Sequence, residues 1–515
     1  MRLKYTWALA LLLSGCQLTQ SDSTSSTPET NKSEQTAKQN AVKAQPGNKS
    51  SLAKKSANDA PKVLSPQEQE DVWQRIAMQL DMDIPNHKKV DYYRTWYLKH
   101  PNHLYTVSKR ATPFLYMITK RIEERGLPME LALLPVVESS FDAFAYSHGS
   151  AAGLWQFVPG TGKMGLEQNY WYDGRRDVAA ATDAALDYLV QLNERFDGNW
   201  EHAIAAYNSG GGRVSSAIRK NKKLGKPIDF FSLDLPKETS SYVPKLLALA
   251  DVIANQDKYG LNIPAIPNKP VLTLVDPEEQ LDLAIAADYA GISVKELQSY
   301  NPAYNQWSTA PEGPHQLLIP VEKKETFLTK VEKNRGKGMK VARYKVKSGD
   351  SLSVLANKYG TTTKVIRRAN GLSNNNIRIG QYLLIPTSTK DDAKYALTAQ
   401  NRLNKTQSRA RGQLKLTHVV QSGESLWSIA RNNKVSYKSL AKWNGMSLKI
   451  PLRVGQKLVI WKDSDKGSVI RTVFYNVRSG DTISGIASKF KVKTNDIVKW
   501  NSLHKKKILT TRSKA

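Results

Sequence analysis

Apolar residues recur at the three- and four-residue spacing of an α-helix in the part of the chain that begins near Ser65. Asp177 and Asn199 stand where their side chains could cap two of these helices. No convincing alternation of apolar and polar residues, the pattern of a half-buried strand, occurs between residues 65 and 260. The sequence therefore predicts an α-rich domain over residues 65–262. The predicted helices cover residues 67–79, 113–125, 129–137, 182–196 and 200–207.

The C-terminal part of the chain repeats itself. A Ser-Gly step followed by an acidic residue occurs three times, and each glycine is followed at fixed distances by an alanine and an asparagine. Three copies with the same two spacings indicate one repeated structural unit. The three sets are Gly349, Ala356 and Asn370; Gly423, Ala430 and Asn444; and Gly480, Ala487 and Asn501.

The first copy predicts how one unit folds. A short apolar strand at 344–346 runs into the glycine turn, and Asp350 or Ser351 can cap the helix that follows. A second helix is expected over 363–369, and the apolar run at 380–385 is a closing strand. The order strand, helix, helix, strand makes a small α+β (βααβ) module.

These repeats resemble the lysin motif (LysM), a module that binds glycans containing N-acetylglucosamine, such as peptidoglycan. The resemblance covers 342–386 and 415–461 fully, and residues 387–414 are expected to link the two modules. The third copy, 473–515, is incomplete, because no Gly-Gln step and no apolar closing strand follow Asn501. We expect this copy to fold and bind poorly on its own.

An earlier, degenerate copy is expected over residues 263–335. Ala287 and Asn301 keep the separation seen between the alanine and asparagine of the other copies. The run Leu317-Leu318-Ile319-Pro320 matches Leu383-Leu384-Ile385-Pro386, but Gln280 stands at the position of the glycine. This segment is therefore predicted to be a LysM-like domain.

The N-terminus has the layout of a secretory signal. Arg2 and Lys4 precede an apolar run at residues 7–13, and small residues follow it. The run is too short to cross a bilayer as a helix. We therefore predict a signal peptide over residues 1–15.

Cys16 is the only cysteine of the chain, so no intramolecular disulfide can form. Leu13-Ser14-Gly15-Cys16 resembles a bacterial lipobox, which implies a lipoprotein acylated at Cys16 and a lipid anchor in the membrane. Gln17, rather than an aspartate, follows the cysteine, and the resemblance then favours the outer membrane, facing the periplasm. The alternative is a chance cysteine in an ordinary signal peptide. Residues 16–64 are polar and nearly free of aromatics, which predicts a flexible tether.

The net charge of +30 is concentrated in one part of the chain. Residues 321–515 contain 42 Lys and Arg against 11 Asp and Glu, which accounts for the whole excess. A basic surface attracts polyanions such as nucleic acid, anionic lipid or acidic wall polymers, or it serves only for solubility. The predicted export and the glycan-binding repeats argue against nucleic acid as the partner.

Four short motifs follow one another in the α-rich domain: Glu138-Ser139, Gly153-Leu154-Trp155-Gln156, Ala206-Tyr207-Asn208 and Tyr242. They resemble those of the family 1 lytic transglycosylases, whose soluble-type catalytic domain has a goose-lysozyme-like fold. One departure is Trp155, which stands where the family has methionine. The resemblance spans about residues 65–260 and implies a lysozyme-like catalytic domain.

Glu138 is the candidate catalytic residue. Cleavage of a glycosidic bond needs a proton on the leaving oxygen, and a carboxyl group supplies it near neutral pH only if its pKa is raised, usually by an apolar pocket. The apolar run 131–137 before Glu138 suits such a pocket. Most glycosidases use a second carboxylate. Asp142 is a poor candidate because the helix is expected to end before it, and Asp173 and Asp177 are expected in turn and cap positions.

The family resemblance implies that Glu138 acts twice on the bond between N-acetylmuramic acid (MurNAc) and N-acetylglucosamine (GlcNAc). It first donates a proton to the leaving sugar, and its carboxylate then takes the proton of the muramic 6-hydroxyl, which attacks C1. The product is a 1,6-anhydro sugar, and no water is consumed. Neither a cofactor nor a metal is expected. The histidines are scattered, and His148 and His202 have no partners at metal-ligand spacing.

The resemblance also implies roles around Glu138, although each polar residue could instead serve only a turn or a cap. Ser147 would contact the acetamido region, and Ser139 would orient Glu138 or the nearby backbone. Substrate hydrogen bonds and the shape of the cleft are then assigned to Gln156, Asn208, Tyr207 and Tyr242.

The sequence as a whole predicts a multidomain protein, with an α-rich lysozyme-like catalytic domain followed by βααβ LysM modules. The predicted function is that of a peptidoglycan lytic transglycosylase that binds glycan strands of the wall. Two alternatives remain, namely a lysozyme-like hydrolase using Glu138 and Asp142, and a non-catalytic wall-binding scaffold. Exo or endo cutting and the oligomeric state stay open.

Overall fold

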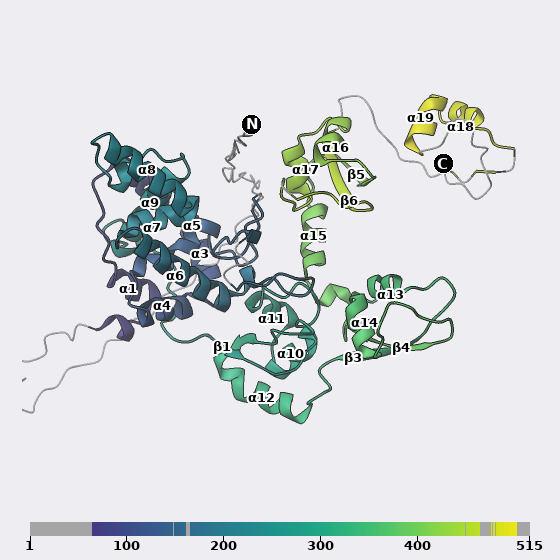
Figure 1. The fold of residues 1–515 in the computed structure, drawn as a ribbon, viewed down its shortest axis with the longest axis horizontal. Coiled ribbons are helices and arrows are strands. Elements are labelled where there is room, and N and C mark those ends of the chain that lie inside the picture. Colours follow the sequence, from purple (N-terminus) through teal and green to yellow (C-terminus); the bar gives the residue numbers. More distant parts are fainter. Residues whose placement is uncertain are drawn as a thin grey trace, which may run out of the picture. The chain divides into compact units, whose positions relative to one another are not determined.

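The computed structural model of the chain describes residues 64–147, 149–160, 165–448, 450–463, 475, 477–478 and 480–501 (Figure 1). The predicted signal peptide, Cys16, nearly all of the predicted tether and His148 lie outside these residues. The chain divides into two compact units after Leu403, and each is described by itself.

The first unit begins with the predicted helical domain. Two predicted caps are confirmed, since the Asp177 carboxylate accepts from the backbone N–H of Ala180 and Asn199 Oδ1 from that of His202. Among the described residues of 64–262 there is no strand, only isolated bridges. The α-helices (α) and 3-10 helices (η) are η1 (Pro66–Glu68), α1 (Val72–Ala77), α2 (Lys88–Lys99), α3 (Pro101–Ala111), α4 (Leu115–Glu124), η2 (Met129–Leu133), α5 (Leu134–Ser139), η4 (Gly174–Arg176), α6 (Val178–Arg195), α7 (Trp200–Ser209), α8 (Gly211–Lys223), η5 (Phe230–Ser232) and α9 (Thr239–Ala254).

Helix α9 runs through the core of this domain and packs against α2, α7 and α5. Val243, Leu246 and Leu247 are completely buried, and most other residues of the helix are buried as well. A helix that is apolar on most sides belongs inside a domain rather than on its surface. Any side chain that α9 directs towards α5 is therefore held on a rigid element.

The LysM-like domain and the first two LysM modules have the predicted βααβ order, each with one two-stranded antiparallel sheet (Figure 1). The LysM-like domain contains β1 (Leu272–Val275), α10 (Leu283–Ala290), α11 (Val294–Tyr300) and β2 (Leu317–Pro320), followed by η6 (Val321–Lys323) and α12 (Lys324–Lys333). The first full module contains β3 (Lys340–Lys345), α13 (Leu352–Lys358), α14 (Thr363–Ala369) and β4 (Tyr382–Thr387). The second contains β5 (Leu414–Val419), α16 (Leu426–Asn432), α17 (Tyr437–Trp443) and β6 (Lys457–Lys462), and the third α18 (Ile483–Lys489) and α19 (Thr494–Trp500).

In the LysM-like domain and the first two modules, the recurring asparagine joins the second helix to the closing strand. Asn370 Nδ2 donates to the carbonyl of Leu384, whose N–H donates back to Asn370 Oδ1, both at 2.7 Å. Asn444 makes the same pair of bonds with Val459, at 2.8 and 2.7 Å, and Asn301 makes it with Leu318. The repeated asparagine is therefore a structural residue of the module, and the degenerate copy keeps it.

The first module also settles which residue caps its first helix. Ser351 Oγ accepts from the N–H of Val354, so Ser351 is the cap. Asp350 instead accepts from the N–H of Lys347 and the hydroxyl of Tyr344, across the glycine turn. The closing segment of the third copy, beyond Asn501, lies outside the described residues, so its expected weakness stays a prediction.

The segment after β4 packs on the LysM-like domain as well as connecting two modules. It contains η7 (Asp392–Lys394) and the start of α15 (Ala399–Ser408). The Tyr395 ring is completely buried, and its hydroxyl donates to the buried carboxylate of Asp282. The first part of this predicted linker is therefore fixed on the first unit.

Candidate active site

Glu138 lies at the C-terminal end of the short helix α5. The helix stops there because Ser140 and Phe141 both take the left-handed conformation, with φ of 51° and 57°. Their N–H groups donate back to the carbonyls of Val136 and Pro135. The predicted helix end before Asp142 is confirmed, and the chain turns away after Ser139.

The hydroxyl of Tyr242, on the buried helix α9, donates a hydrogen bond to Glu138 Oε1 at 2.5 Å. Glu138 itself is only partly buried, whereas Tyr242 is almost fully buried. Burial raises the pKa of the Glu138 carboxyl to about 7, since it outweighs the opposing effect of the Tyr242 hydrogen bond. The negative charge of Glu238 raises this pKa further, and the positive charge of Lys245 lowers it.

Ser139 and Tyr207 attach the surroundings of Glu138 to the turn formed by residues 153–156. Ser139 Oγ lies 3.0 Å from the carbonyl oxygens of both Pro135 and Leu154. The Tyr207 hydroxyl donates to the carbonyl of Trp155 at 2.8 Å. Burial raises the pKa of the Tyr207 hydroxyl well above its usual value, and the nearby charge of Glu138 adds to the shift. The phenol therefore stays protonated and can keep donating.

The turn itself is tightly fitted. Gly153 has a φ of +79°, and a Cβ added there would lie 2.0 Å from the carbonyl oxygen of Arg175, so only glycine fits. Gln156 is also left-handed, and its Nε2 donates to the carbonyl of Gly153 at 2.8 Å. The Trp155 ring is completely buried, and its Nε1 donates to Thr182 Oγ1 on α6. Trp155 thus serves the core behind the turn.

Ser147 and Asn208 hold neighbouring backbone and side chains. Ser147 Oγ accepts from the N–H groups of Gly149 and Ala151, at 3.2 and 3.0 Å, and so shapes its own loop. Asn208 Oδ1 accepts from Thr239 Oγ1 at 2.9 Å, which joins the end of α7 to the start of α9. The structure thus places Tyr242 on Glu138 and brings Ser139, Tyr207 and Gln156 together at the adjoining turn.

Asp142, the second carboxylate of the hydrolase alternative, is engaged elsewhere. Its Oδ1 accepts from the N–H of Phe144, and its Oδ2 lies 3.9 Å from the guanidinium of Arg110. The charges with the largest effect on the Glu138 pKa belong to Glu238 and Lys245. Sequence reasoning missed these two residues, which α9 brings to the site and which no motif marks.

Asp173 and Asp177 have the predicted turn and cap positions, at the starts of η4 and α6. Within the described residues, no group of three or more His, Cys, Asp or Glu side chains could hold a metal ion. His202 is buried, and its Nε2 lies 2.9 Å from the carbonyl oxygen of Ile228. Its role is therefore in the packing of α7.

Family comparisons match the helical domain, the LysM-like domain and the three LysM copies. Residues 116–230 match the Transglycosylase SLT domain, and residues 271–334 match the family described as Lytic transglycosylase MltD, LysM-like domain. The LysM domain matches residues 344–386, 418–461 and 475–510. A helical SLT domain followed by LysM modules defines a lytic transglycosylase that acts on peptidoglycan.

The chain is 37% identical over 405 residues to membrane-bound lytic murein transglycosylase D of Escherichia coli strain K12, covering 76% of this chain and 85% of that protein. The chain therefore belongs to the membrane-bound lytic murein transglycosylase D family. It is also 29% identical over 172 residues to the autolysin of Enterococcus faecalis, covering 31% of this chain and 22% of that protein.

Among solved structures, the lytic transglycosylase Slt of Pseudomonas aeruginosa, crystallised as an inactive mutant, is 24% identical to this chain. The match has a TM-score of 0.24 and covers 37% of this chain and 33% of that protein. The matches to the SLT domain, the LysM domain and the E. coli protein together make the chain a lytic murein transglycosylase, a peptidoglycan lyase, whose LysM modules bind the wall.

Proposed function

We propose that Glu138 alone serves as acid and then base in the cleavage of the β-1,4 bond between MurNAc and GlcNAc. In the first step its protonated carboxyl gives a proton to the leaving GlcNAc oxygen, and the bond from C1 of MurNAc to that oxygen breaks. In the second, the carboxylate takes the proton of the MurNAc 6-hydroxyl while the 6-oxygen bonds to C1. Atoms balance without water, and the product carries a 1,6-anhydroMurNAc end.

The observation that carries this proposal is the pKa of about 7 at a carboxyl group that a tyrosine holds in place. At neutral pH both protonation states are then populated, as a group needs when it must donate a proton and take one back. Tyr242 donates to Oε1, which leaves Oε2 to carry the transferable proton.

The remaining predicted residues take supporting roles in this proposal. Tyr242 and Tyr207 shape the cleft beside Glu138, and Ser139 fixes the end of α5 against the turn. Gln156 and Asn208 hydrogen-bond the substrate near the cleavage point, and Ser147 contacts the acetamido group of MurNAc. All but Ser147 and Asn208 are connected to Glu138 through the contacts described above.

A comparison of two carboxylate variants tests the assignment. Glu138→Gln keeps the size and the hydrogen bond acceptor but has no proton to exchange, so digestion of purified sacculi should fall by at least about 1,000-fold, close to what an entire general acid–base step contributes. Asp142→Asn should leave the rate within a factor of about three, since it keeps the oxygen that accepts from the N–H of Phe144 and removes only a weak ion pair with Arg110. A Glu138→Gln variant with the parent rate would eliminate the mechanism, and an inactive Asp142→Asn variant would favour the hydrolase.

We also propose that the protein is anchored in the outer membrane by lipid at Cys16 and faces the periplasm. The lipobox-like sequence and the word membrane-bound in the name of the E. coli relative support this. Among the described residues, no helix is both long and apolar enough to cross a membrane. Metabolic labelling with a fatty acid should mark the parent protein and not Cys16→Ser, and equal labelling of both would refute the anchor.

A further inference from the structure

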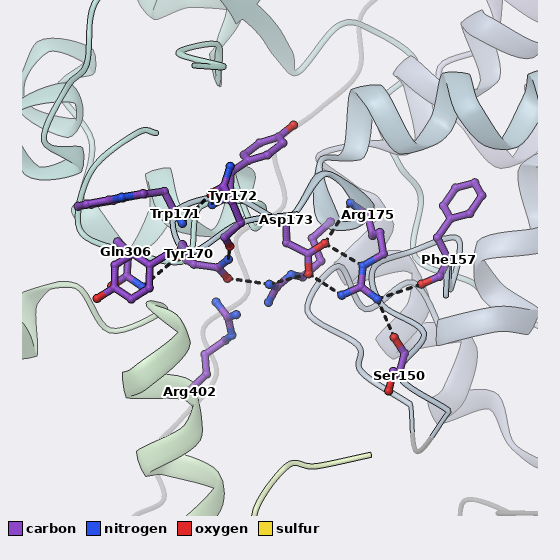
Figure 2. Close-up of polar contacts among 12 residues, drawn as sticks. Ser150, Phe157, Tyr170, Trp171, Tyr172, Asp173, Arg175, Gln306 and Arg402 are labelled. Carbon is purple, nitrogen blue, oxygen red and sulfur yellow. Dashed lines mark hydrogen bonds and ion pairs between the residues drawn. The ribbon is translucent and has the colours of Figure 1, made fainter. Parts of the chain in front are cut away.

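The LysM-like domain touches the catalytic domain at a loop, residues 169–176, that leads back to the active-site turn (Figure 2). The N–H of Asp173 donates to the carbonyl of Ala303 at 2.9 Å, and the N–H of Asn305 donates to the carbonyl of Trp171 at 2.8 Å. The rings of Trp171 and Trp307 pack edge to face, with centroids 5.8 Å apart. The loop is therefore fixed to the LysM-like domain by backbone bonds and by packing.

On its other side, the same loop holds the active-site turn. The Asp173 carboxylate accepts from Nε and Nη2 of Arg175, both at 2.9 Å, in a two-point ion pair that is nearly buried (Figure 2). Arg175 Nη1 then donates to the carbonyls of Ser150 and Phe157, at 2.7 and 3.4 Å. Those two residues bracket the turn, and the backbone of Gly153 lies directly against the carbonyl of Arg175.

Asn305 closes the connection from the LysM-like domain. Arg176 Nη2 donates to Asn305 Oδ1 at 2.7 Å and to Asp173 Oδ2 at 3.0 Å. Arg175 and Arg176 therefore share one carboxylate, and Asn305 fixes the second guanidinium. Since buried charged groups are stable only when their hydrogen bonds are satisfied, the loss of one partner should force the others to move.

We propose that Asn305, Arg176, Asp173 and Arg175 form a positioning network through which the LysM-like domain holds the turn of residues 150–157 in its catalytic geometry. These are positioning residues, because none of them reaches Glu138. The turn contacts Ser139 and Tyr207, so its displacement changes the surroundings of Glu138. The LysM-like domain is thus part of the catalytic apparatus. This inference rests on the proposed role of Glu138.

The test compares Asn305→Ala with Gln306→Ala in the full chain. Both changes remove a side chain at the same contact, but Gln306 donates only to the carbonyl of Tyr170, at 3.1 Å, and does not reach the arginines (Figure 2). The assay uses soluble, peptide-free glycan as the substrate and measures the products by mass spectrometry. We expect Asn305→Ala to lower kcat roughly tenfold, within the ~100-fold that a 1 Å misplacement can cause. KM should change less, and Gln306→Ala should match the parent.

Two further variants keep the proposal open to refutation. Asn305→Asp keeps the acceptor for Arg176 and should restore most of kcat. Arg176→Gln breaks the contact between Asn305 and Arg176 from the other side, so it should lower kcat as Asn305→Ala does. If Asn305→Ala does not fold, Arg176→Gln provides the test of the network. Two results would overturn the network. The first is an equal kcat for Asn305→Ala and Gln306→Ala. The second is a loss of kcat that parallels a loss of melting temperature and that Asn305→Asp does not reverse. Failure of the Glu138 proposal would show separately, as an active Glu138→Gln variant.

Discussion

Replacing Tyr242 with phenylalanine should move the pH dependence of the enzyme to higher pH. The Tyr242 hydroxyl donates at 2.5 Å to Glu138 Oε1 and lowers the pKa of that carboxyl, which burial raises to about 7. The acid step needs protonated Glu138, so kcat/KM should fall as pH rises through the pKa. Without the hydroxyl the carboxylate loses a hydrogen bond, and the pKa rises further.

The size of the shift follows from the strength of that bond. A hydrogen bond to a charged group contributes about 1.5–3 kcal/mol, and part of it persists with the neutral acid. A remaining difference of about 1.4 kcal/mol corresponds to roughly one pH unit. We therefore expect the alkaline limb of the kcat/KM profile to move from about pH 7 to roughly one unit higher.

The assay is release of soluble products from glycan strands between pH 5 and pH 9, with Tyr207→Phe as the matched control. Tyr207 donates to the carbonyl of Trp155 and not to Glu138, so this variant should keep the alkaline limb of the parent. If the alkaline limb of Tyr242→Phe stays in place or moves to lower pH, the Tyr242 hydrogen bond does not lower the pKa of Glu138.

Three further predictions concern stability and local fit. The pKa of Glu138 in the folded protein lies above its ordinary value of 4.5, so ionisation of Glu138 destabilises the fold increasingly from about pH 4.5 to 7. The free energy of unfolding of Glu138→Gln should therefore exceed that of the parent by up to about 3 kcal/mol at pH 8 and nearly equal it at pH 4. Urea titrations that show no gain at pH 8 would contradict this. Gly153→Ala should lose nearly all activity because its Cβ would meet the Arg175 carbonyl at 2.0 Å, whereas Gly212→Ala, which meets nothing within 4 Å, should match the parent. Asn444→Ala should lower the free energy of unfolding of the second LysM module by at least about 2 kcal/mol, since it leaves the Val459 backbone unpaired. It should also speed hydrogen exchange at Val459 far more than Asn433→Ala does, because the Asn433 side chain donates only to the carbonyl of Ile429 in its own helix.

The architecture could be predicted well because each helix, strand or module is marked by a signal in its own sequence. Helical spacing, the caps at Asp177 and Asn199 and the repeated asparagine all report on neighbours within one element or one module. The end of α5 could also be predicted, because Ser139-Ser140-Phe141 is a poor continuation of a helix. These features need no knowledge of distant contacts.

The site could be predicted only where a motif marks it. Tyr242 was assigned to the cleft by resemblance, yet its bond to Glu138 joins residues far apart in the chain, which spacing cannot reveal. Trp155 stands where the family has methionine, and the burial of its ring against α6 is a contact that no local signal marks. The pairing of Asn305 with Arg176 depends on how two domains meet, and neither residue carries a local signal for it.

In the proposed mechanism, one carboxyl group completes the reaction without water. Digestion of peptidoglycan in water enriched in oxygen-18, followed by mass spectrometry of the released glycan ends, tests it most directly. Attack by the 6-hydroxyl should give anhydro ends that carry no label and lack the mass of one water. Reducing ends that incorporate the heavy oxygen during the reaction would contradict it and identify a hydrolase.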